Sequence, residues 1–164
     1  MYWWKLGPLR TALATRTLPE QASFLYLFLM TVFTMVFYEF LPESDGGRTA
    51  WDDFLSAVAV AMTALGTCAA YRSNGGGAGQ GFLERYMALS FVLALRVVLI
   101  APFYFMAMAI VGTMWGWMDD ATGPFDVVTL SGIYGIYYAW LVLEMGRVAD
   151  EQRRLPAAAA VLAK

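Results

Sequence analysis

The fold is decided by one apolar stretch, residues 86–118, which reads YMALSFVLALRVVLIAPFYFMAMAIVGTMWGWM. Its only charged side chain is that of Arg96. As one helix rising 1.5 Å per residue, the stretch is roughly 50 Å long, whereas a hydrocarbon core of about 30 Å needs only about 20 residues. We therefore predict a membrane-spanning helix whose surplus length is absorbed by tilt, by a kink at Pro102 or by extension beyond the membrane.

Three other apolar stretches have the length of membrane helices, namely residues 23–41, 54–71 and 125–145. Sixty per cent of the chain is hydrophobic and the mean hydropathy is +0.56, well above the globular average. We predict an all-α membrane protein in which residues 1–164 form a single transmembrane domain, a four-transmembrane-helix bundle. Residues 1–20 are expected to be a short interfacial segment and residues 146–164 a cytoplasmic tail.

Basic residues sort to one side of the four predicted spans. The N-terminal segment, the connection between the second and third spans and the C-terminal tail carry Lys5, Arg10, Arg16, Arg72, Arg85, Arg147, Arg153, Arg154 and Lys164. The two remaining connections carry only Arg48. Since excess Lys and Arg marks the cytoplasmic side, both termini are expected inside. The preference for Arg over Lys, together with abundant alanine, points to a bacterial inner (cytoplasmic) membrane.

The N-terminal segment has the pattern of a helix lying in the membrane interface. Leu9, Ala12 and Leu13 are expected to face lipid, while Arg10 and Arg16 face phosphate. Tryptophans suited to the headgroup level are the predicted interfacial anchors on the two sides, namely Trp3, Trp4, Trp115 and Trp117.

Small residues mark the expected contacts between helices, because membrane helices associate through close van der Waals packing. The predicted packing residues are Ala57 and Ala61 in the second span, Gly112 and Gly116 in the third, and Ser131, Gly135 and Ala139 in the fourth. The second span, which is rich in alanine, is expected to be central. The bulky first span is expected at the periphery.

Arg96 has two alternative depths. Counted from the outer end of its span, it lies roughly 33 Å down, at the inner interface and level with Glu144 of the fourth span. Counted from the inner end, it lies about 13 Å into the core, where Glu39 is the nearest embedded acid. We favour the first placement and the Glu144 neighbourhood, and snorkelling of Arg96 to lipid phosphate is a close alternative.

The favoured depth leaves residues 86–95 projecting inward with a largely apolar surface. Such a surface should not stay exposed to water. We therefore predict either a strongly tilted third helix or an inner extension that is covered by the N-terminal segment, by another copy of the chain or by a partner.

Residues 73–81 read SNGGGAGQG and form the connection between the second and third spans. Glycine-rich loops can cradle phosphates, but a P-loop needs a preceding strand and a terminal Lys-Ser/Thr, and a dinucleotide fingerprint needs a strand-helix unit. Neither context is present, so this Gly-rich cytoplasmic loop is interpreted as a flexible linker.

Catalytic chemistry is poorly supplied. The chain has no histidine and a single cysteine, Cys68, so it lacks an imidazole base, histidine ligands for haem or zinc, and a partner for a disulfide. The acidic residues expected on the outer side do not follow the spacing of an EF-hand. We predict no enzyme activity, no cofactor and no metal site.

Two functions fit this reading. The first is a small non-enzymatic accessory or scaffold subunit, with membrane lipids and either further copies of itself or other membrane-protein subunits as partners and no nucleic acid. The alternative is a homo-oligomeric channel or small-solute transporter with an acidic outer mouth.

Overall fold

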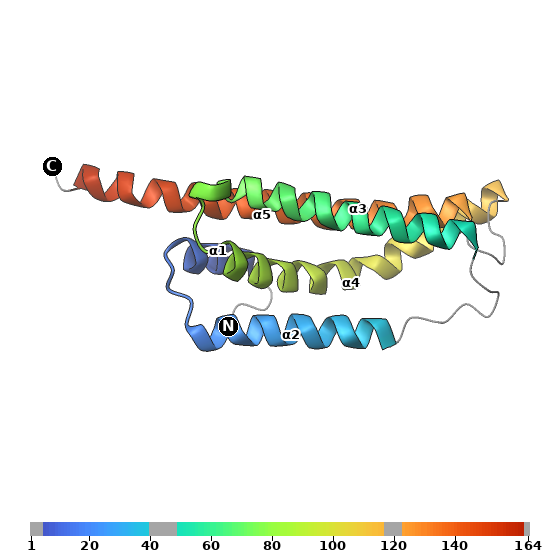
Figure 1. Ribbon diagram of the computed structural model, residues 1–164, viewed down its shortest axis with the longest axis horizontal. Coiled ribbons are helices and arrows are strands. Elements are labelled where there is room, and N and C mark those ends of the chain that lie inside the picture. Colours follow the sequence, from blue (N-terminus) through green and yellow to red (C-terminus); the bar gives the residue numbers. More distant parts are fainter. Residues whose placement is uncertain (1–4, 40–48, 117–122, 163–164) are drawn as a thin grey trace.

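The structure, a computed structural model, describes residues 5–39, 49–116 and 123–162, and it is all-α as predicted. Its elements are α1 (Leu6–Ala14), α2 (Glu20–Glu39), α3 (Ala50–Ser73), the short 3-10 turn η1 (Gly76–Ala78), α4 (Phe82–Trp115) and α5 (Pro124–Leu162). Figure 1 shows the long helices running side by side along one direction.

Three helices are long and apolar enough to cross a membrane, over Ala50–Ser73, Phe82–Trp115 and Pro124–Leu155. The described apolar part of α2, Gln21–Met30, is shorter. The chain therefore has three candidate membrane helices, and the fourth span and the orientation remain predictions.

The ends of these helices carry recognisable stop and start signals. Thr49 accepts from the backbone N–H of Asp52, and the Asp52 carboxylate accepts from the backbone N–H of Thr49, so a capping box begins α3. Gly81 precedes α4 and Gly116 ends it, both with positive φ, which glycine adopts without a steric penalty.

The centre of the bundle is α5, not the second predicted span. α5 packs against α3 along its length and also against α4 and α1, whereas α3 packs mainly on α5. The prediction that 54–71 is central was therefore wrong. The peripheral position predicted for the first span is confirmed, because α2 lies against α4 on the side away from α3 and α5.

Glycines on α3 and α5 explain how α5 accepts neighbours on several sides. A Cβ on Gly66 of α3 would lie 2.2 Å from Cδ1 of Tyr138, so the Tyr138 ring of α5 packs directly on the α3 backbone. A Cβ on Gly132 of α5 would lie 2.4 Å from the Tyr104 hydroxyl of α4. Removing the side chain at these two points allows the close approach on which membrane helices rely.

The N-terminal helix α1 packs on protein. Leu9 and Leu13 are almost fully buried, Ala12 is buried as well, and α1 contacts α5 and α4. The prediction that these three side chains face lipid was therefore wrong. At 34 and 39 residues, α4 and α5 are roughly 51 and 58 Å long, well over a bilayer core, so their surplus turns offer α1 an apolar surface.

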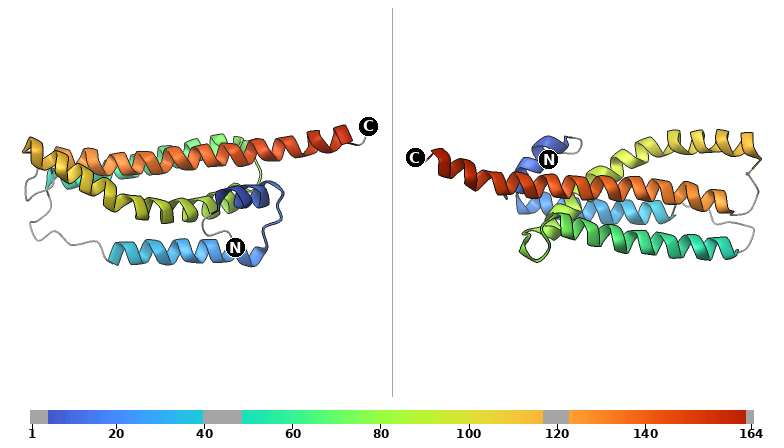
Figure 2. Two further views of the ribbon diagram at one scale, coloured as in Figure 1. Left: turned by 180° about the vertical axis from the view of Figure 1, so that it is seen from behind. Right: turned by 90° about the horizontal axis from the view of Figure 1, so that it is seen from above.

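The prediction that protein covers the apolar stretch 86–95 is confirmed, with the N-terminal segment as part of the cover, whereas its position on the inner side of a membrane stays a prediction. Ala88, Leu89, Phe91, Val92 and Leu93 of α4 are all at most 3% exposed and share one core cluster with α1, α2 and α5 side chains. Figure 2 shows α1 lying across one end of the long helices, which we call the α1 end, and α4 curving along its length. Pro102 lies inside α4, where its ring removes one helical hydrogen bond and favours such a bend.

Candidate functional site

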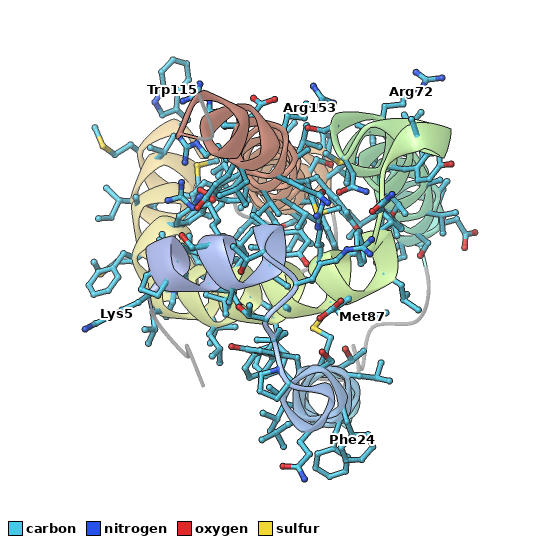
Figure 3. All side chains as sticks on the ribbon, turned by 90° about the vertical axis from the view of Figure 1, so that its left-hand side faces the viewer. Lys5, Phe24, Arg72, Met87, Trp115 and Arg153 are labelled. Carbon is cyan, nitrogen blue, oxygen red and sulfur yellow. The ribbon has the colours of Figure 1, made fainter. Side chains whose placement is uncertain are left out.

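Polar side chains gather at the α1 end, where α1, the Gly-rich turn, the first turns of α4 and residues 144–153 of α5 meet. The cluster contains the buried side chains of Glu144, Arg85 and Asn74. Figure 3 looks onto this end and shows Arg153 on α5 and Arg72 at the end of α3.

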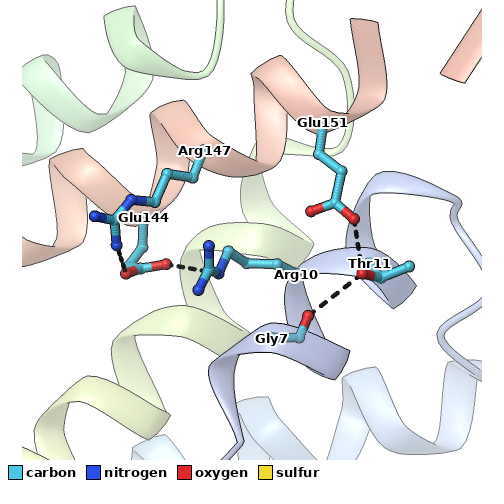
Figure 4. Close-up of polar contacts among 6 residues, drawn as sticks. All are labelled: Gly7, Arg10, Thr11, Glu144, Arg147 and Glu151. Atoms are coloured by element: carbon cyan, nitrogen blue, oxygen red, sulfur yellow. Dashed lines mark hydrogen bonds and ion pairs between the residues drawn. The ribbon is translucent and has the colours of Figure 1, made fainter. Parts of the chain in front are cut away.

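Glu144 is the acid at the centre of one network. Its side chain is 1% exposed, and Oε2 lies 3.0 Å from Nε of Arg10, while Oε1 accepts a hydrogen bond of 2.6 Å from Arg147 (Figure 4). Both arginines are partly exposed, at 29% and 56% of their side chains. Both cations stabilise the buried carboxylate. Their charge-assisted contacts offset the free-energy cost of taking it out of water.

A second contact fastens α1 to α5 two turns further along. The Thr11 hydroxyl lies 2.7 Å from Oε1 of Glu151, to which it donates (Figure 4). Arg10 and Thr11 are neighbours on α1, and Glu144 and Glu151 are one heptad apart on α5, so both acids lie on the same side of that helix. These two polar contacts fix the position of α1 along α5, beside the buried side chains of Leu9 and Leu13.

Arg85 is the centre of another network. It is 2% exposed and donates to Oδ1 of Asn74 at 2.8 Å and to Oε1 of Gln152. Among the residues that the structure places, Arg85 forms no ion pair. The adjacent Glu84 instead accepts from the Ser23 hydroxyl of α2 at 3.1 Å, which ties α2 to this end of α4.

The expected pair of Arg96 and Glu144 is not formed. Glu144 takes Arg10 and Arg147, while the Arg96 guanidinium lies 5.4 Å from the centre of the Trp140 ring, a cation-π distance. Arg96 thus lies one helical turn from Glu144 but does not reach it, because α1 docks on α5 and brings Arg10 to that carboxylate. The pairing with Glu144 was therefore wrong, and the depth of Arg96 in a membrane stays a prediction. The side chain of Glu39 lies outside the described side chains.

The predicted packing residues fall into two groups. Gly112 is buried, and Gly135 would place a Cβ 3.5 Å from Cε of Met62 in α3. Ser131 is half-buried, whereas Gly116, Ala57, Ala61 and Ala139 are exposed. Within residues 5–39, 49–116 and 123–162 these four positions are exposed, so their role in packing stays a prediction.

Of the predicted interfacial anchors, Trp115 is 65% exposed in the last turn of α4. Trp3, Trp4 and Trp117 lie outside the described residues. Trp115 therefore has the exposure that contact with a membrane interface requires, and its role as an anchor stays a prediction.

Sequence reasoning assigned Arg10 to lipid phosphate and so missed its pairing with Glu144, and it missed the group of Arg85, Asn74 and Gln152. No local pattern in the sequence relates these residues to one another. α5 also carries two i,i+3 ion pairs, between Glu144 and Arg147 and between Asp150 and Arg153.

A pocket of about 310 Å3 opens beside this group, between the Gly-rich turn and α5. The turn has a defined conformation: Asn74 caps α3, Gly75 and Gly76 have positive φ, and η1 leads into α4. Across the described ranges, no group of three His, Cys, Asp or Glu side chains is placed to hold a metal ion.

Comparison of the chain with protein families, with curated proteins and with solved structures found no match. The fold therefore defines the class directly. Its three helices, long and apolar enough to cross a membrane, indicate a multi-pass membrane protein.

Proposed function

We propose that the protein is a non-enzymatic accessory or scaffold subunit of a membrane assembly, with both termini in the cytoplasm and a bacterial inner membrane as its location. The observation that carries this proposal is a stripe of small side chains on α3 that none of the described helices covers. We infer that this stripe associates with a second copy of the chain or with another membrane-protein subunit.

α3 has small residues on two opposite sides. On one side, Gly66 and Ala70 are buried against α5. On the other side, Ala64 and Cys68 are exposed, and each is two residues from Gly66, about half a turn around the helix. The first side supports the core of the chain, and the second is available to a partner.

The exposed side is regular. Ala57, Ala61, Ala64 and Cys68 are separated by four, three and four residues, which places them in one stripe along the helix. All four are exposed. Lipid gains nothing from small side chains, whereas another helix gains close backbone approach, so this stripe is better suited to a helix than to lipid.

Cys68 makes the proposal testable with a native side chain. In a symmetric pair of copies related by a twofold axis along the membrane normal, the two Cys68 thiols lie at the same depth. Oxidation of native membranes with a copper catalyst is expected to give a covalent dimer, and a bismaleimide is expected to give either that dimer or a heavier adduct with a different subunit.

A matched cysteine serves as the control. Leu99 lies on α4 and is 57% exposed, so Leu99→Cys in a Cys68→Ala background presents an apolar, equally accessible thiol on another helix. Crosslinking at position 68 that greatly exceeds crosslinking at 99, and that is suppressed by Ala61→Phe, supports the proposal. Equal yields at both positions, or no adduct together with a monomer in native mass spectrometry, would overturn it.

A further inference from the structure

The pocket beside the Gly-rich turn is lined by glycines and alanines together with four side chains that can donate hydrogen bonds, namely Asn74, Gln80, Gln152 and Arg153. It lies one residue beyond the C-terminal end of α3, at the end of a candidate membrane helix, and its walls include Gly75, Gly79, Gln152 and Arg153. Asn74 forms part of its lining. The hydrogen bonds of Arg85 determine how the side-chain amides of Asn74 and Gln152 are oriented.

A guanidinium group can only donate hydrogen bonds, so every atom that it bonds must be an acceptor. Arg85 therefore fixes the oxygen of Asn74 and the oxygen of Gln152 toward itself. The amide NH2 groups of both side chains are left to point elsewhere. At Asn74 that NH2 group is buried and has no hydrogen-bond partner within the part of the chain that the structure describes.

The site carries positive charge as well as hydrogen-bond donors, and both favour an anion. Arg85 is a buried cation whose two hydrogen-bond partners are neutral. Arg153 adds a second cation at the rim, where a guanidinium nitrogen lies 3.5 Å from the position of a Cβ on Gly75. The acid nearest to it is Asp150, at 3.5 Å in a pair whose side chains are both about two-thirds exposed, and such a pair holds an arginine only weakly.

Glycine keeps the pocket open. A Cβ on Gly79 would lie 2.7 Å from the unpartnered Asn74 nitrogen and 2.4 Å from the Asn74 carbonyl oxygen. Any side chain at position 79 would therefore displace the floor of the pocket. Gly79, within the segment that sequence analysis interpreted as a linker, thus has a spatial reason to lack a side chain.

We propose that this pocket binds a phosphate-bearing anion. Amide and guanidinium donors beside a buried cation whose hydrogen-bond partners are neutral suit phosphate oxygens, which accept several charge-assisted bonds at once. A basic pocket at the end of membrane helices suits an anionic lipid headgroup, and a free phosphate compound offers the same chemistry. On binding, the Arg153 guanidinium leaves Asp150 and pairs with the anion. The amide NH2 groups of Asn74 and Gln152 donate hydrogen bonds to the phosphate oxygens.

The test uses the full-length protein in mild detergent and in nanodiscs. Its thermal unfolding midpoint is measured with inorganic phosphate, and in phosphatidylglycerol nanodiscs against phosphatidylcholine nanodiscs; lipid retention is read by native mass spectrometry. A rise with phosphatidylglycerol alone identifies a lipid headgroup, and a rise with inorganic phosphate alone identifies a soluble phosphate. A rise with both assigns recognition to the phosphate group itself, and no rise with either overturns the proposal.

Asn74→Asp separates binding from folding. The carboxylate keeps the acceptor for Arg85 and gives it an ion pair, so the ligand-free protein is expected to be at least as stable as the parent, while the anion loses a donor and meets a like charge. Arg153→Gln is expected to weaken binding about tenfold, the effect of losing one charge-assisted bond, and Arg154→Gln, next in sequence and outside the pocket, should have no effect. Anion binding that survives Asn74→Asp in the folded protein would refute the assignment.

Discussion

The two halves of α4 have similar apolar composition and opposite surroundings. Between Arg85 and Leu93 most side chains are buried, whereas from Val98 to Trp115 most large apolar side chains are exposed. The first half packs under α1 and beside α2 and α5, and the second half has fewer neighbours. Hydrophobicity along a helix therefore shows where water is excluded, but not whether protein or lipid replaces it.

Charges follow the same division. In the covered half, Arg85 is fully buried because Asn74 and Gln152 accept its donors. Near the boundary between the halves, Arg96 is half-buried over the Trp140 ring. Burial of charge thus occurs where α1 and the Gly-rich turn add side chains around the long helices, and the following changes test that dependence.

The largest effect is expected from removing the cover. Leu9→Asp places a carboxylate at a position with 0% exposure, so we expect it to cost at least ~3 kcal/mol and to detach α1. The measurement is thiol labelling of Ala12→Cys, a position 8% exposed on the packed side of α1, in a Cys68→Ala background. A water-soluble maleimide should react slowly with it before the Leu9 change and quickly afterwards.

Thr15→Asp is the control for that labelling experiment, because Thr15 is exposed just beyond the same helix. It introduces the same charge without entering the interface and should leave labelling slow. Fast labelling of Ala12→Cys in the otherwise unchanged protein would show that α1 does not stay docked, and the contrast between the halves of α4 would then need another cause.

Adding a side chain at the close contact between α3 and α5 should have the next largest effect on stability. Gly66→Val brings side-chain atoms into the Tyr138 ring, so we expect a loss of about 2–3 kcal/mol in unfolding by sodium dodecyl sulfate. Tyr138→Ala in the same chain makes room for the valine, and the double variant should therefore lose less than the sum of the two single changes. Additive losses would mean that this contact does not limit the approach of the helices.

The buried ion pair should matter more than its exposed counterpart. Glu144→Gln removes the charge shared by Arg10 and Arg147, and we expect a loss of about 1–2 kcal/mol because the carboxylate is 1% exposed. Asp150→Asn breaks the equivalent i,i+3 pair with Arg153, in which both side chains are mostly exposed, and should cost less than about 0.5 kcal/mol. Equal losses in denaturant titrations would remove the distinction between covered and exposed charge.

The smallest of the four principal effects is expected where α5 meets the exposed half of α4. Gly132→Ala meets only the hydroxyl of Tyr104, the mobile end of a long side chain, and pushes it off the Thr129 carbonyl, to which it donates at 2.9 Å. We expect a loss of about 1 kcal/mol, close to that of Tyr104→Phe, because both lose the same hydrogen bond. A much larger loss for Gly132→Ala in calorimetry would show that α4 is held rigidly here as well.

Sequence reasoning recovered what depends on hydropathy. The all-α class, the apolar helices from residue 50 onward and the need to cover residues 86–95 follow from composition and length, and the structure has them. Sequence reasoning predicted that α3 is central because small residues occur on many sides of it. The central helix, α5, instead has single glycines at particular contacts, such as Gly132 against Tyr104.

The polar cluster lay beyond sequence reasoning for a different reason. Arg10 and Glu144 are more than 130 positions apart, and no local period relates them. Arg85, Asn74 and Gln152 come from three elements that meet only after the Gly-rich turn has folded back on α5. Such groupings are products of packing, and the depth of each residue along its own helix does not reveal them.

Because α1 docks on α5, it can reach its final position only after α5 has been synthesised. α1 is synthesised first, but Glu151 is 140 positions after Thr11, so at about 5–20 residues per second its anchor follows roughly 7–28 s later. During that interval Leu6, Leu9 and Leu13 have no α5 to pack on, and we expect α1 to rest on the membrane surface, as its amphipathic sequence suggests. A photo-crosslinker at Leu9 should capture lipid in nascent chains stalled before residue 144 and α5 in the finished protein, so that the interfacial helix is a stage of biosynthesis.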